Sequence, residues 1–335
     1  METSIILNIS ENIELDIDLV AEAKLKDKIK HLAFELGFDD IGFAPYQLMK
    51  DEAYNYRNWI DNGYNATMEW MNNYVEIRED IRLLMEDTNS VIVLIHNYKS
   101  QNHKEDNYKI SKYAWGDDYH NVLKSKLKKL CKSIESEVKE NSELNIKIPD
   151  FQYRFFTDTG PILERQWAVK SGIGWQGKNG LLISKKKGSF VFISVILTNL
   201  KFSEPKIVSD YCGKCTKCID SCPTNAIIQP KVIDANKCIA YWTIETRNDE
   251  SFPKEIKDNL ENWAFGCDIC QDVCPWNNHR VPITQEVRFF PRNGSTNFNK
   301  NEILNINEEE FAIKFNNSPI KRAKFEGLKR NIKEL

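Results

Sequence analysis

Seven of the nine cysteines in this chain fall into two blocks whose spacing is typical of iron–sulfur ligation, and an eighth lies between the blocks. The first block, Cys212–Pro223, has the pattern C-x2-C-x2-C-x3-C-P, in which the fourth cysteine of two-cluster ferredoxins ligates the other cluster. The second block, Cys267–Pro275, is one cysteine short, and Cys238 lies between the blocks and can supply the missing thiolate. The spacing therefore predicts crossed ligation of two [4Fe-4S] clusters. One set is Cys212, Cys215, Cys218 and Cys274, and the other is Cys222, Cys238, Cys267 and Cys270.

Two zinc knuckles are the alternative interpretation, because short C-x2-C pairs also bind zinc. Both blocks end in x3-Cys-Pro, however, and that spacing suits a cubane with a neighbouring cubane. The sequence therefore favours clusters over zinc. The ninth cysteine, Cys131, falls in a predicted helix and takes no part in this assignment.

The length and charge of the chain set broad limits on its class. At 335 residues it is expected to form about two domains, and a net charge of −3 gives no overall attraction to nucleic acid. The N-terminus is acidic rather than basic, unlike a secretory signal, and the longest nearly apolar run, Phe190–Leu197, is too short to span a bilayer. Cluster-type cysteines without an export signal indicate a reducing compartment. We therefore expect a soluble cytoplasmic protein without a membrane partner.

The elements that must position the cysteines are irregularly mixed helices and strands, which predicts an α+β fold. Helices are expected at 19–36, 54–60, 68–71, 118–140 and 161–171, and strands at 38–44, 90–96 and 151–156. The helix at 161–171 would carry Pro161 in its first turn. Strands at 181–184 and 189–198 are expected to form a hairpin across Lys185–Gly188.

This pattern divides the chain into four expected segments. Residues 1–18 are expected to be a loosely ordered lead, 19–202 a catalytic domain and 203–285 a ferredoxin-like domain. Residues 286–335 form a C-terminal segment that is expected to end in a basic amphipathic helix, Ile320–Leu335.

A glycine-rich motif, Gly172–Gly177, matches the dinucleotide-binding pattern G-x-G-x-x-G. That pattern binds a pyrophosphate only where a strand precedes it and a helix follows, and here the expected order is reversed. Dinucleotide binding is therefore disfavoured. A glycine loop that lets the backbone approach a flat, bulky ligand is the better interpretation.

Asp158 is the main candidate for chemistry outside the cysteine blocks. It stands between the expected strand 151–156 and a helix, where a carboxylate often only caps backbone N–H groups. The alternative is a proton donor, because a reduction that removes oxygen needs protons as well as electrons. The residues alone leave both interpretations open.

Several stretches together resemble the epoxyqueuosine reductases, which complete queuosine at the wobble position of certain tRNAs. These stretches lie between about residue 20 and the last residue, and they cover nearly the whole chain. They are Gly63–Met71 (GYNATMEWM), Arg78–Arg82 (REDIR), Tyr113–His120 (YAWGDDYH), Thr157–Gly160 (TDTG), Ala168–Asn179 (AVKSGIGWQGKN), the two cysteine blocks and Ile320–Asn331 (IKRAKFEGLKRN).

The resemblance implies a cobalamin-binding domain of nitroreductase-like fold, related to reductive dehalogenases and fused to a two-cluster ferredoxin module. It implies cobalamin bound base-off, without an axial histidine from the protein. Consistent with this, Asp118–His120 begins like the D-x-H-x-x-G motif of His-ligated cobalamin proteins, but Leu123 replaces the glycine. Asp158 matches the family's proposed proton donor. The implied cobalamin pocket comprises Arg78, Tyr119, His120, Asp158, Leu182, Ile193 and Ile239.

The resemblance also implies the partners. One partner is a tRNA with a GUN anticodon that carries epoxyqueuosine. The other is an external low-potential electron donor. The enzyme is expected to be a monomer. The expected tRNA contacts are Thr246, Arg247, Lys321 and Arg322, and the lysines of the 185–187 turn are a second candidate for phosphate binding. Two other functions stay open: a cobalamin-dependent reductive dehalogenase or other small-molecule reductase, and a ferredoxin-like electron carrier.

Overall fold

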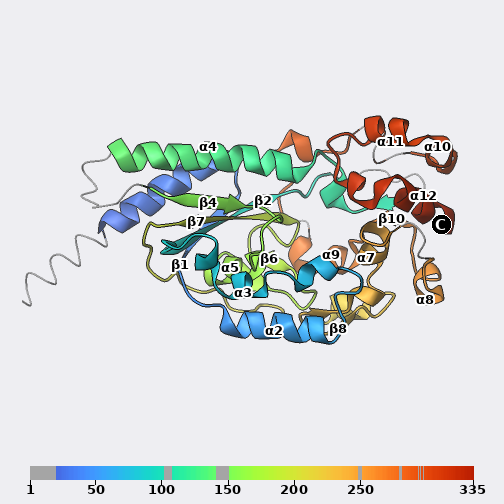
Figure 1. Cartoon of the computed structure of the whole chain (residues 1–335), viewed down its shortest axis with the longest axis horizontal. Helices are drawn as coiled ribbons and strands as arrows, with labels where there is room; N and C mark the ends of the chain where they lie inside the picture. Colours follow the sequence, from blue (N-terminus) through green and yellow to red (C-terminus); the bar gives the residue numbers. More distant parts are fainter. Residues whose placement is uncertain are drawn as a thin grey trace, which may run out of the picture.

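A computed structural model describes residues 20–101, 108–140, 151–247, 251–278, 281–292, 294, 296 and 298–335. Its centre is an antiparallel four-stranded sheet with the order β1-β2-β7-β4 (Figure 1). The strands are β1 (Asp40–Pro45), β2 (Ser90–Asn97), β7 (Val191–Thr198) and β4 (Tyr153–Phe156). The expected lead, 1–18, lies outside the described residues.

Helices cover both faces of this sheet (Figure 1). On one face, the helix at residues 20–35 and α4 (Tyr119–Glu140) pack against Ile92 and Leu94 of β2, and the buried Cys131 belongs to this layer. On the other face, α5 (Glu164–Lys170) packs through Trp167 against Val93 of β2. Every residue of β2 is buried, which explains why residues 91–95 are continuously apolar rather than alternating.

Short elements complete the N-terminal half. They are α2 (Lys50–Asp61), η1 (Glu69–Asn72), α3 (Val75–Glu79), η2 (Ile81–Leu83), β3 (Lys109–Ile110), η3 (Lys112–Ala114), β5 (Gly174–Gln176) and β6 (Leu182–Ser184). The prediction of helices near 54–60 and 118–140 is confirmed by α2 and α4. The segment 68–71 forms only a 3-10 helix, and α3 was not anticipated from the sequence.

Two expectations about this half are wrong. The strands around Lys185–Gly188 do not form a hairpin with each other, because β6 pairs with β5 while β7 pairs with β2 and β4. Only a single bridge, Ser184 to Gly188, closes the turn. The helix expected from residue 161 begins at Glu164, so Pro161 precedes it instead of occupying its first turn.

The cysteine-rich segment is made of short elements held between longer loops. They are α6 (Lys217–Asp220), β8 (Ile227–Gln229), β9 (Val232–Ile233), η5 (Ala235–Lys237), α7 (Ile239–Ile244), α8 (Lys254–Lys257), β10 (Trp263–Phe265), α9 (Ile269–Asp272) and η6 (Pro275–Asn277). β10 pairs in parallel with β3, so this segment is joined by backbone hydrogen bonds to the N-terminal half.

The C-terminal segment packs on that junction. It contains η7 (Val287–Phe289), α10 (Lys300–Asn305), α11 (Glu308–Lys314), η8 (Pro319–Ala323) and α12 (Lys324–Glu334). The single helix expected over 320–335 is divided, because Lys324 has φ = +64° and separates η8 from α12. The apolar side chains of Ile320, Ala323 and Leu328 are buried as the helical spacing predicts. No helix in the described ranges is long and apolar enough to cross a membrane.

Candidate active site

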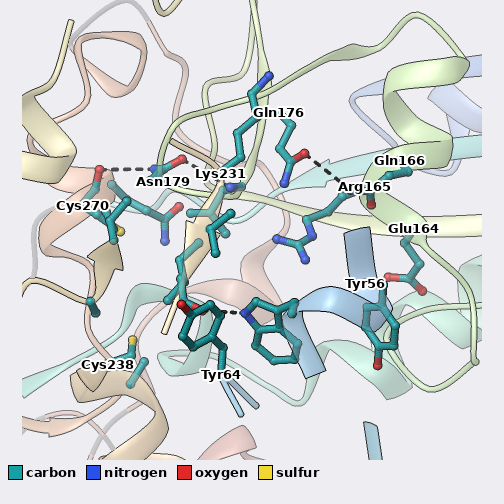
Figure 2. Close-up of a pocket in the computed structure, with 18 of the residues that line it drawn as sticks. Tyr56, Tyr64, Glu164, Arg165, Gln166, Gln176, Asn179, Lys231, Cys238 and Cys270 are labelled. Carbon is teal, nitrogen blue, oxygen red and sulfur yellow. Dashed lines mark hydrogen bonds between the residues drawn. The ribbon is translucent and has the colours of Figure 1, made fainter. Parts of the chain in front are cut away.

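A cavity of about 1230 Å³ lies between the sheet domain and the cysteine-rich segment. Figure 2 shows Tyr56, Glu164 and Arg165 on one side of it and Cys238 and Cys270 on the other. Its wall therefore combines side chains from α2 and α5 with the thiols of the cysteine-rich segment. The arrangement places cysteine thiols and titratable groups around one space that can hold a large ligand.

Asp158 lies at the wall of this cavity in an unusual backbone conformation, with φ = +59°. The preceding Thr157 is fully buried, and its hydroxyl donates to the carbonyl of Ile193 over 3.0 Å. This anchor ties the loop after β4 to β7. A non-glycine residue at positive φ is uncommon and concentrates at functional sites, where the surroundings hold it in place.

Two side chains from the start of α4 contact the Asp158 carboxylate. The Tyr119 hydroxyl donates to Oδ2 over 2.5 Å, and Nε2 of His120 lies 3.4 Å from the same oxygen. Since α5 has Leu163 at its N-cap and no side-chain cap, the structure does not place Asp158 as a capping residue. These contacts argue against the capping interpretation, and the role of Asp158 as a proton donor stays a prediction.

His120 is held between two carboxylates. Its Nδ1 lies 2.7 Å from Asp118, and its Nε2 faces Asp158. Burial by itself lowers the pKa of His120, but hydrogen bonds to Asp118 and Asp158 outweigh that effect and raise the pKa to about 9. His120 is therefore expected to carry a positive charge beside Asp158 at neutral pH.

Glu164 holds the Asp158 loop from the other side. Its Oε1 accepts a 2.7 Å hydrogen bond from the backbone N–H of Asp158. Burial, followed by the nearby charge of Asp158, raises the pKa of Glu164 to about 8. A buried carboxyl group with a raised pKa thus contacts the backbone of the Asp158 loop, an arrangement that is common at functional sites.

Four cysteines line the same cavity as Asp158. They are Cys222, Cys238, Cys267 and Cys270. Burial, and then the charges of Cys238 and Cys222, raise the pKa of Cys267 to about 12. Asn179 donates a 3.4 Å hydrogen bond to the carbonyl of Cys270, and Figure 2 shows this contact bridging the glycine-rich segment to the cysteines.

The other four block cysteines line a second cavity of about 550 Å³. They are Cys212, Cys215, Cys218 and Cys274. Burial, and then the charges of Cys274 and Cys212, raise the pKa of Cys218, so the thiols also interact within this group. Cys215 is exposed. The eight cysteines therefore line two cavities in sets of four, and each set is one that the spacing predicts for one cluster. The ligation itself stays a prediction.

Only some of the residues expected around cobalamin line the large cavity. Arg78 and Ile239 line the large cavity, and Arg78 stacks over Tyr56 with 4.9 Å from its guanidinium carbon to the ring centroid. Tyr119 and His120 contact Asp158 but do not line the cavity. Leu182 is buried in β6 and Ile193 lies in β7, also outside the lining.

The glycine-rich segment forms the hairpin β5–β6 rather than a strand-to-helix turn. This confirms that its sequence order is wrong for a dinucleotide fingerprint. Gln176, Asn179 and Leu181 from this hairpin line the cavity, so the segment does face a large ligand site.

The expected tRNA contacts lie just after the end of α7 and within η8. Ile239 and Ile244 of α7 line the cavity, and Glu245 directly after α7 binds Arg322 over 2.7 Å. Arg247 is half exposed and donates to the carbonyl of Arg322 over 3.2 Å, and Lys321 is exposed. Thr246 is buried, with its hydroxyl bonded to the carbonyl of Trp242, so its side chain is not accessible to RNA.

Sequence reasoning missed several residues of this site. Glu164, Arg165, Tyr56 and Trp59 line the cavity but belong to no recognisable motif. Glu164 follows Asp158 by six residues, and an acidic residue near a helix start ordinarily indicates only a favourable dipole contact. The signal that singles it out, acceptance of the Asp158 N–H, is tertiary.

Two family models match the chain. Residues 78–159 match "Epoxyqueuosine reductase QueG, DUF1730", and residues 211–277 match "4Fe-4S double cluster binding domain". The second match supports iron–sulfur clusters over zinc for the cysteine blocks.

Relatives of known name align over most of the chain. The epoxyqueuosine reductase of Cellulophaga algicola is 42% identical over 310 residues, which are 92% of this chain and 97% of the relative. That of Synechocystis sp. is 43% identical over 296 residues, covering 87% of this chain and 98% of the relative.

Solved structures of epoxyqueuosine reductases share the fold of this chain. A selenomethionine-labelled epoxyqueuosine reductase superposes with a TM-score of 0.84 at 26% identity over 92% of this chain and 80% of that one. An epoxyqueuosine reductase bound to an epoxyqueuosine-modified tRNA-Tyr stem loop gives 0.80 at 27% identity, with the same coverage. A Bacillus subtilis epoxyqueuosine reductase, whose aspartate-bearing catalytic loop is swung out of the active site, gives 0.81 at 27% identity over 92% and 80%.

Proposed function

The chain belongs to the epoxyqueuosine reductase family, and we propose that it reduces epoxyqueuosine to queuosine at the wobble position of tRNA. The observation that carries this function is one cavity lined both by Asp158 and by a set of four cysteines. Conversion of the epoxide to the alkene consumes two electrons and two protons and releases water. The cavity brings a group that can move a proton next to a route for electrons.

Iron–sulfur clusters supply the electron route, and crossed ligation assigns them to the two cavities. The grouping of the cysteines supports this assignment, because each set of four lines one cavity. The cluster on Cys222, Cys238, Cys267 and Cys270 is the proximal one, since those residues share the cavity with Asp158. The cluster on Cys212, Cys215, Cys218 and Cys274 lies nearer the solvent, where Cys215 is exposed.

Cobalamin fits the large cavity. Its volume of about 1230 Å³ and its mixed apolar and polar lining suit a bulky, flat cofactor, with Arg78, Gln176, Asn179 and Ile239 as the residues that would hold it. When bound, cobalamin would supply a low-valent cobalt centre able to reduce the epoxide. His120 is occupied by Asp118 and Asp158, which supports binding without an axial histidine from the protein.

Asp158 is the proton donor in this account. Tyr119 and His120 orient its carboxyl group toward the cavity, Thr157 anchors its loop, and Glu164 fixes its backbone N–H. The group delivers a proton to the departing epoxide oxygen. The ring of contacts keeps the carboxyl within reach of the substrate without reorganisation during the reaction.

The anticodon is bound by the basic surface beside α7. Arg247, Lys321 and Arg322 provide the phosphate contacts, and the ion pair of Arg322 with Glu245 fixes that arginine next to the cavity-lining helix α7. The tRNA substrates are those with GUN anticodons. The enzyme acts as a cytoplasmic monomer and receives its electrons from an external low-potential donor. Residues 19–202, 203–285 and 286–335 serve as catalytic, ferredoxin-like and C-terminal units.

The test is anaerobic incubation of the reconstituted protein with dithionite, cobalamin and tRNA that carries epoxyqueuosine. Nucleoside mass spectrometry is expected to show loss of one oxygen and appearance of queuosine only when all components are present. A protein that binds corrinoid and dehalogenates chlorinated phenols but leaves the tRNA unchanged would contradict the function. Failure to bind corrinoid after anaerobic reconstitution would instead favour a ferredoxin-like carrier.

A further inference from the structure

Lysines surround the cavity that holds the solvent-side cysteine set. Lys178, Lys185, Lys186 and Lys217 line it together with Cys212, Cys215, Cys218 and Cys274. They come from three separate elements: the β5–β6 turn, the loop after β6, and α6. The fold thus brings together cations that are distant in the sequence, around the one exposed block cysteine.

The charges of the exposed lysines in this rim are not neutralised. Within the described part of the chain, Lys185, Lys186 and Lys217 form no ion pair within 4.0 Å, whereas the adjacent Lys187 binds Asp39 over 2.8 Å. Of the acidic groups nearby, Asp210 binds Lys231 over 3.2 Å, whereas Asp220, which accepts a hydrogen bond from Thr216 over 2.7 Å, keeps its charge. The four lysines that line the cavity outnumber it. The rim therefore presents a net positive surface to the solvent.

Aromatic groups lie inside this rim. Tyr211 is 47% exposed, and its ring lies 5.8 Å from that of Trp276, which also lines the cavity. The Lys185 ammonium stands over the Tyr211 ring at 4.9 Å. An apolar centre surrounded by charge is the general anatomy of a protein interface.

The two cysteine sets differ in access. The four cysteines that share the cavity with Asp158 are all partly buried, whereas Cys215 of the other set is exposed, as are all of residues 213–217 around it. Electron transfer between proteins slows steeply with distance. An external donor must therefore approach the solvent-side set, where the lysine rim lies.

We propose that this lysine-rimmed surface, defined by Lys178, Lys185, Lys186, Lys217 and Tyr211, docks an acidic flavodoxin-type carrier that reduces the solvent-side cluster. The proposal rests on the proposed function and names the partner of its electron route. One electron leaves the flavin hydroquinone and takes one [4Fe-4S] cluster from the 2+ to the 1+ state, so no bond forms or breaks at the interface. Two such transfers supply the two electrons that each epoxide consumes.

Charge and shape both fit this partner. Opposite charges on a carrier and its acceptor speed association by 10- to 1000-fold at low salt, and transient redox contacts are small. The exposed edge of a flavin is aromatic and apolar, which complements the Tyr211 and Trp276 side chains. RNA phosphates would also be attracted by lysines, but the substrate base must reach the other cavity, which contains Asp158.

The test uses the variant Lys185→Glu/Lys217→Glu, which reverses one charge on the loop after β6 and one on α6. The matched control is Lys128→Glu/Lys129→Glu, because both lysines are exposed on α4, outside either cavity lining. Iron content and cluster absorption are checked first, so that only proteins with both clusters are compared. Reduced flavodoxin is then mixed with each protein in an anaerobic stopped-flow instrument, and bleaching of the clusters is followed at low and high salt.

We expect cluster reduction in the test variant to be at least about 10-fold slower at low salt, with the difference closing at high salt. Its affinity for oxidised flavodoxin should fall in parallel, while the control variant matches the wild type. Turnover of tRNA with dithionite should stay unchanged, because dithionite does not need the docking surface.

Equal reduction rates in the wild type and both variants would overturn the proposal. A raised KM for tRNA in dithionite-driven turnover of the test variant would assign the surface to RNA instead. Faster, rim-dependent reduction by an acidic [2Fe-2S] ferredoxin than by flavodoxin would overturn the choice of partner. Absence of dithionite-driven turnover in the wild type would count against the proposed function, and the reduction and binding measurements would still decide the docking surface.

Discussion

The Tyr119 hydroxyl donates a 2.5 Å hydrogen bond to the Asp158 carboxylate, joining the start of α4 to the loop after β4. The two residues are 39 positions apart, and the contact holds Asp158 in a backbone conformation, φ = +59°, that a non-glycine residue rarely adopts. Burial, and then the charge of Asp158, raise the pKa of Tyr119 well above its ordinary range. Tyr119 therefore stays a hydrogen-bond donor throughout the working pH range.

Glu164 is expected to control the position of Asp158 through its backbone N–H. Glu164→Gln keeps an oxygen acceptor for that N–H and should retain most of the turnover. Glu164→Ala removes it and should lower kcat by about 10-fold or more, because a small displacement of a catalytic group is costly. The measurement is dithionite-driven turnover by proteins with matched cluster content.

The pH profile separates this role from simple packing. Since the pKa of Glu164 is about 8, its ionisation above that pH places a negative charge beside the Asp158 loop. Wild-type turnover should decline through pH 8, and Glu164→Gln should weaken that decline. Equal turnover and identical profiles for the wild type and the alanine variant would show that Glu164 has no such role.

His120 is expected to make the stability of the protein depend on pH. Its pKa rises from an ordinary value of 6.5 to about 9 on folding, so its stabilising contribution is complete below pH 6.5 and is lost as the pH rises through 9. His120→Gln should lower the Tm of the cluster-loaded protein by a few degrees at pH 6, corresponding to about 1–3 kcal/mol.

At pH 10 the Tm of His120→Gln and that of the wild type should coincide. His31→Gln is the matched control, because His31 is an exposed histidine on the first helix. A Tm difference that persists unchanged from pH 6 to pH 10 would contradict a charged His120 between Asp118 and Asp158.

Strong local patterns predicted the elements that surround the site. The buried strand β2 was expected from its run of β-branched residues, and α4 was expected as a long, lysine-rich helix. The hairpin expected around Lys185–Gly188 failed because strand pairing depends on the tertiary partner, and β6 pairs with the glycine-rich β5. The division of the last helix at Lys324 likewise has no local signal, since lysine is not typical of positive φ.

The site itself was only partly predictable. The cysteine spacing predicted two sets of four, because ferredoxin ligation leaves a regular record in the sequence. Asp158 was singled out by its place between a strand and a helix, but its contacts with Tyr119, His120 and Glu164 come from three regions of the chain. No local pattern encodes that convergence.

Cys274 is expected to ligate the solvent-side cluster despite its distance in the sequence from Cys212, Cys215 and Cys218. Cys274→Ala should lose that cluster and keep the other, halving the iron content. Iron determination and EPR of the anaerobically reconstituted protein provide the measurement. Cys131→Ala is the control, since Cys131 is buried in α4 away from both cavities. Retention of two intact clusters in Cys274→Ala would refute crossed ligation.

The basic surface beside α7 is expected to bind tRNA phosphates. Arg247→Gln/Lys321→Gln removes two charges but leaves the ion pair of Arg322 with Glu245 in place. The KM for tRNA should rise, and the log–log salt slope of binding should flatten by about 1.4–1.8, or 0.7–0.9 for each lost contact. Lys128→Gln/Lys129→Gln on α4 controls for the change in net charge. An unchanged KM and salt slope would show that this surface does not contact RNA.

The most direct test of the account compares the wild type with Asp158→Asn in single turnovers of epoxyqueuosine-containing tRNA. Both proteins carry cobalamin and both clusters, and both are pre-reduced with dithionite. The asparagine preserves the size of the side chain and can still accept the hydrogen bond from Tyr119, so corrinoid and iron content should match. We expect queuosine to form with the wild type and its rate to fall by about 100-fold or more in the variant. Queuosine formation at the wild-type rate by a fully loaded Asp158→Asn protein would contradict the account.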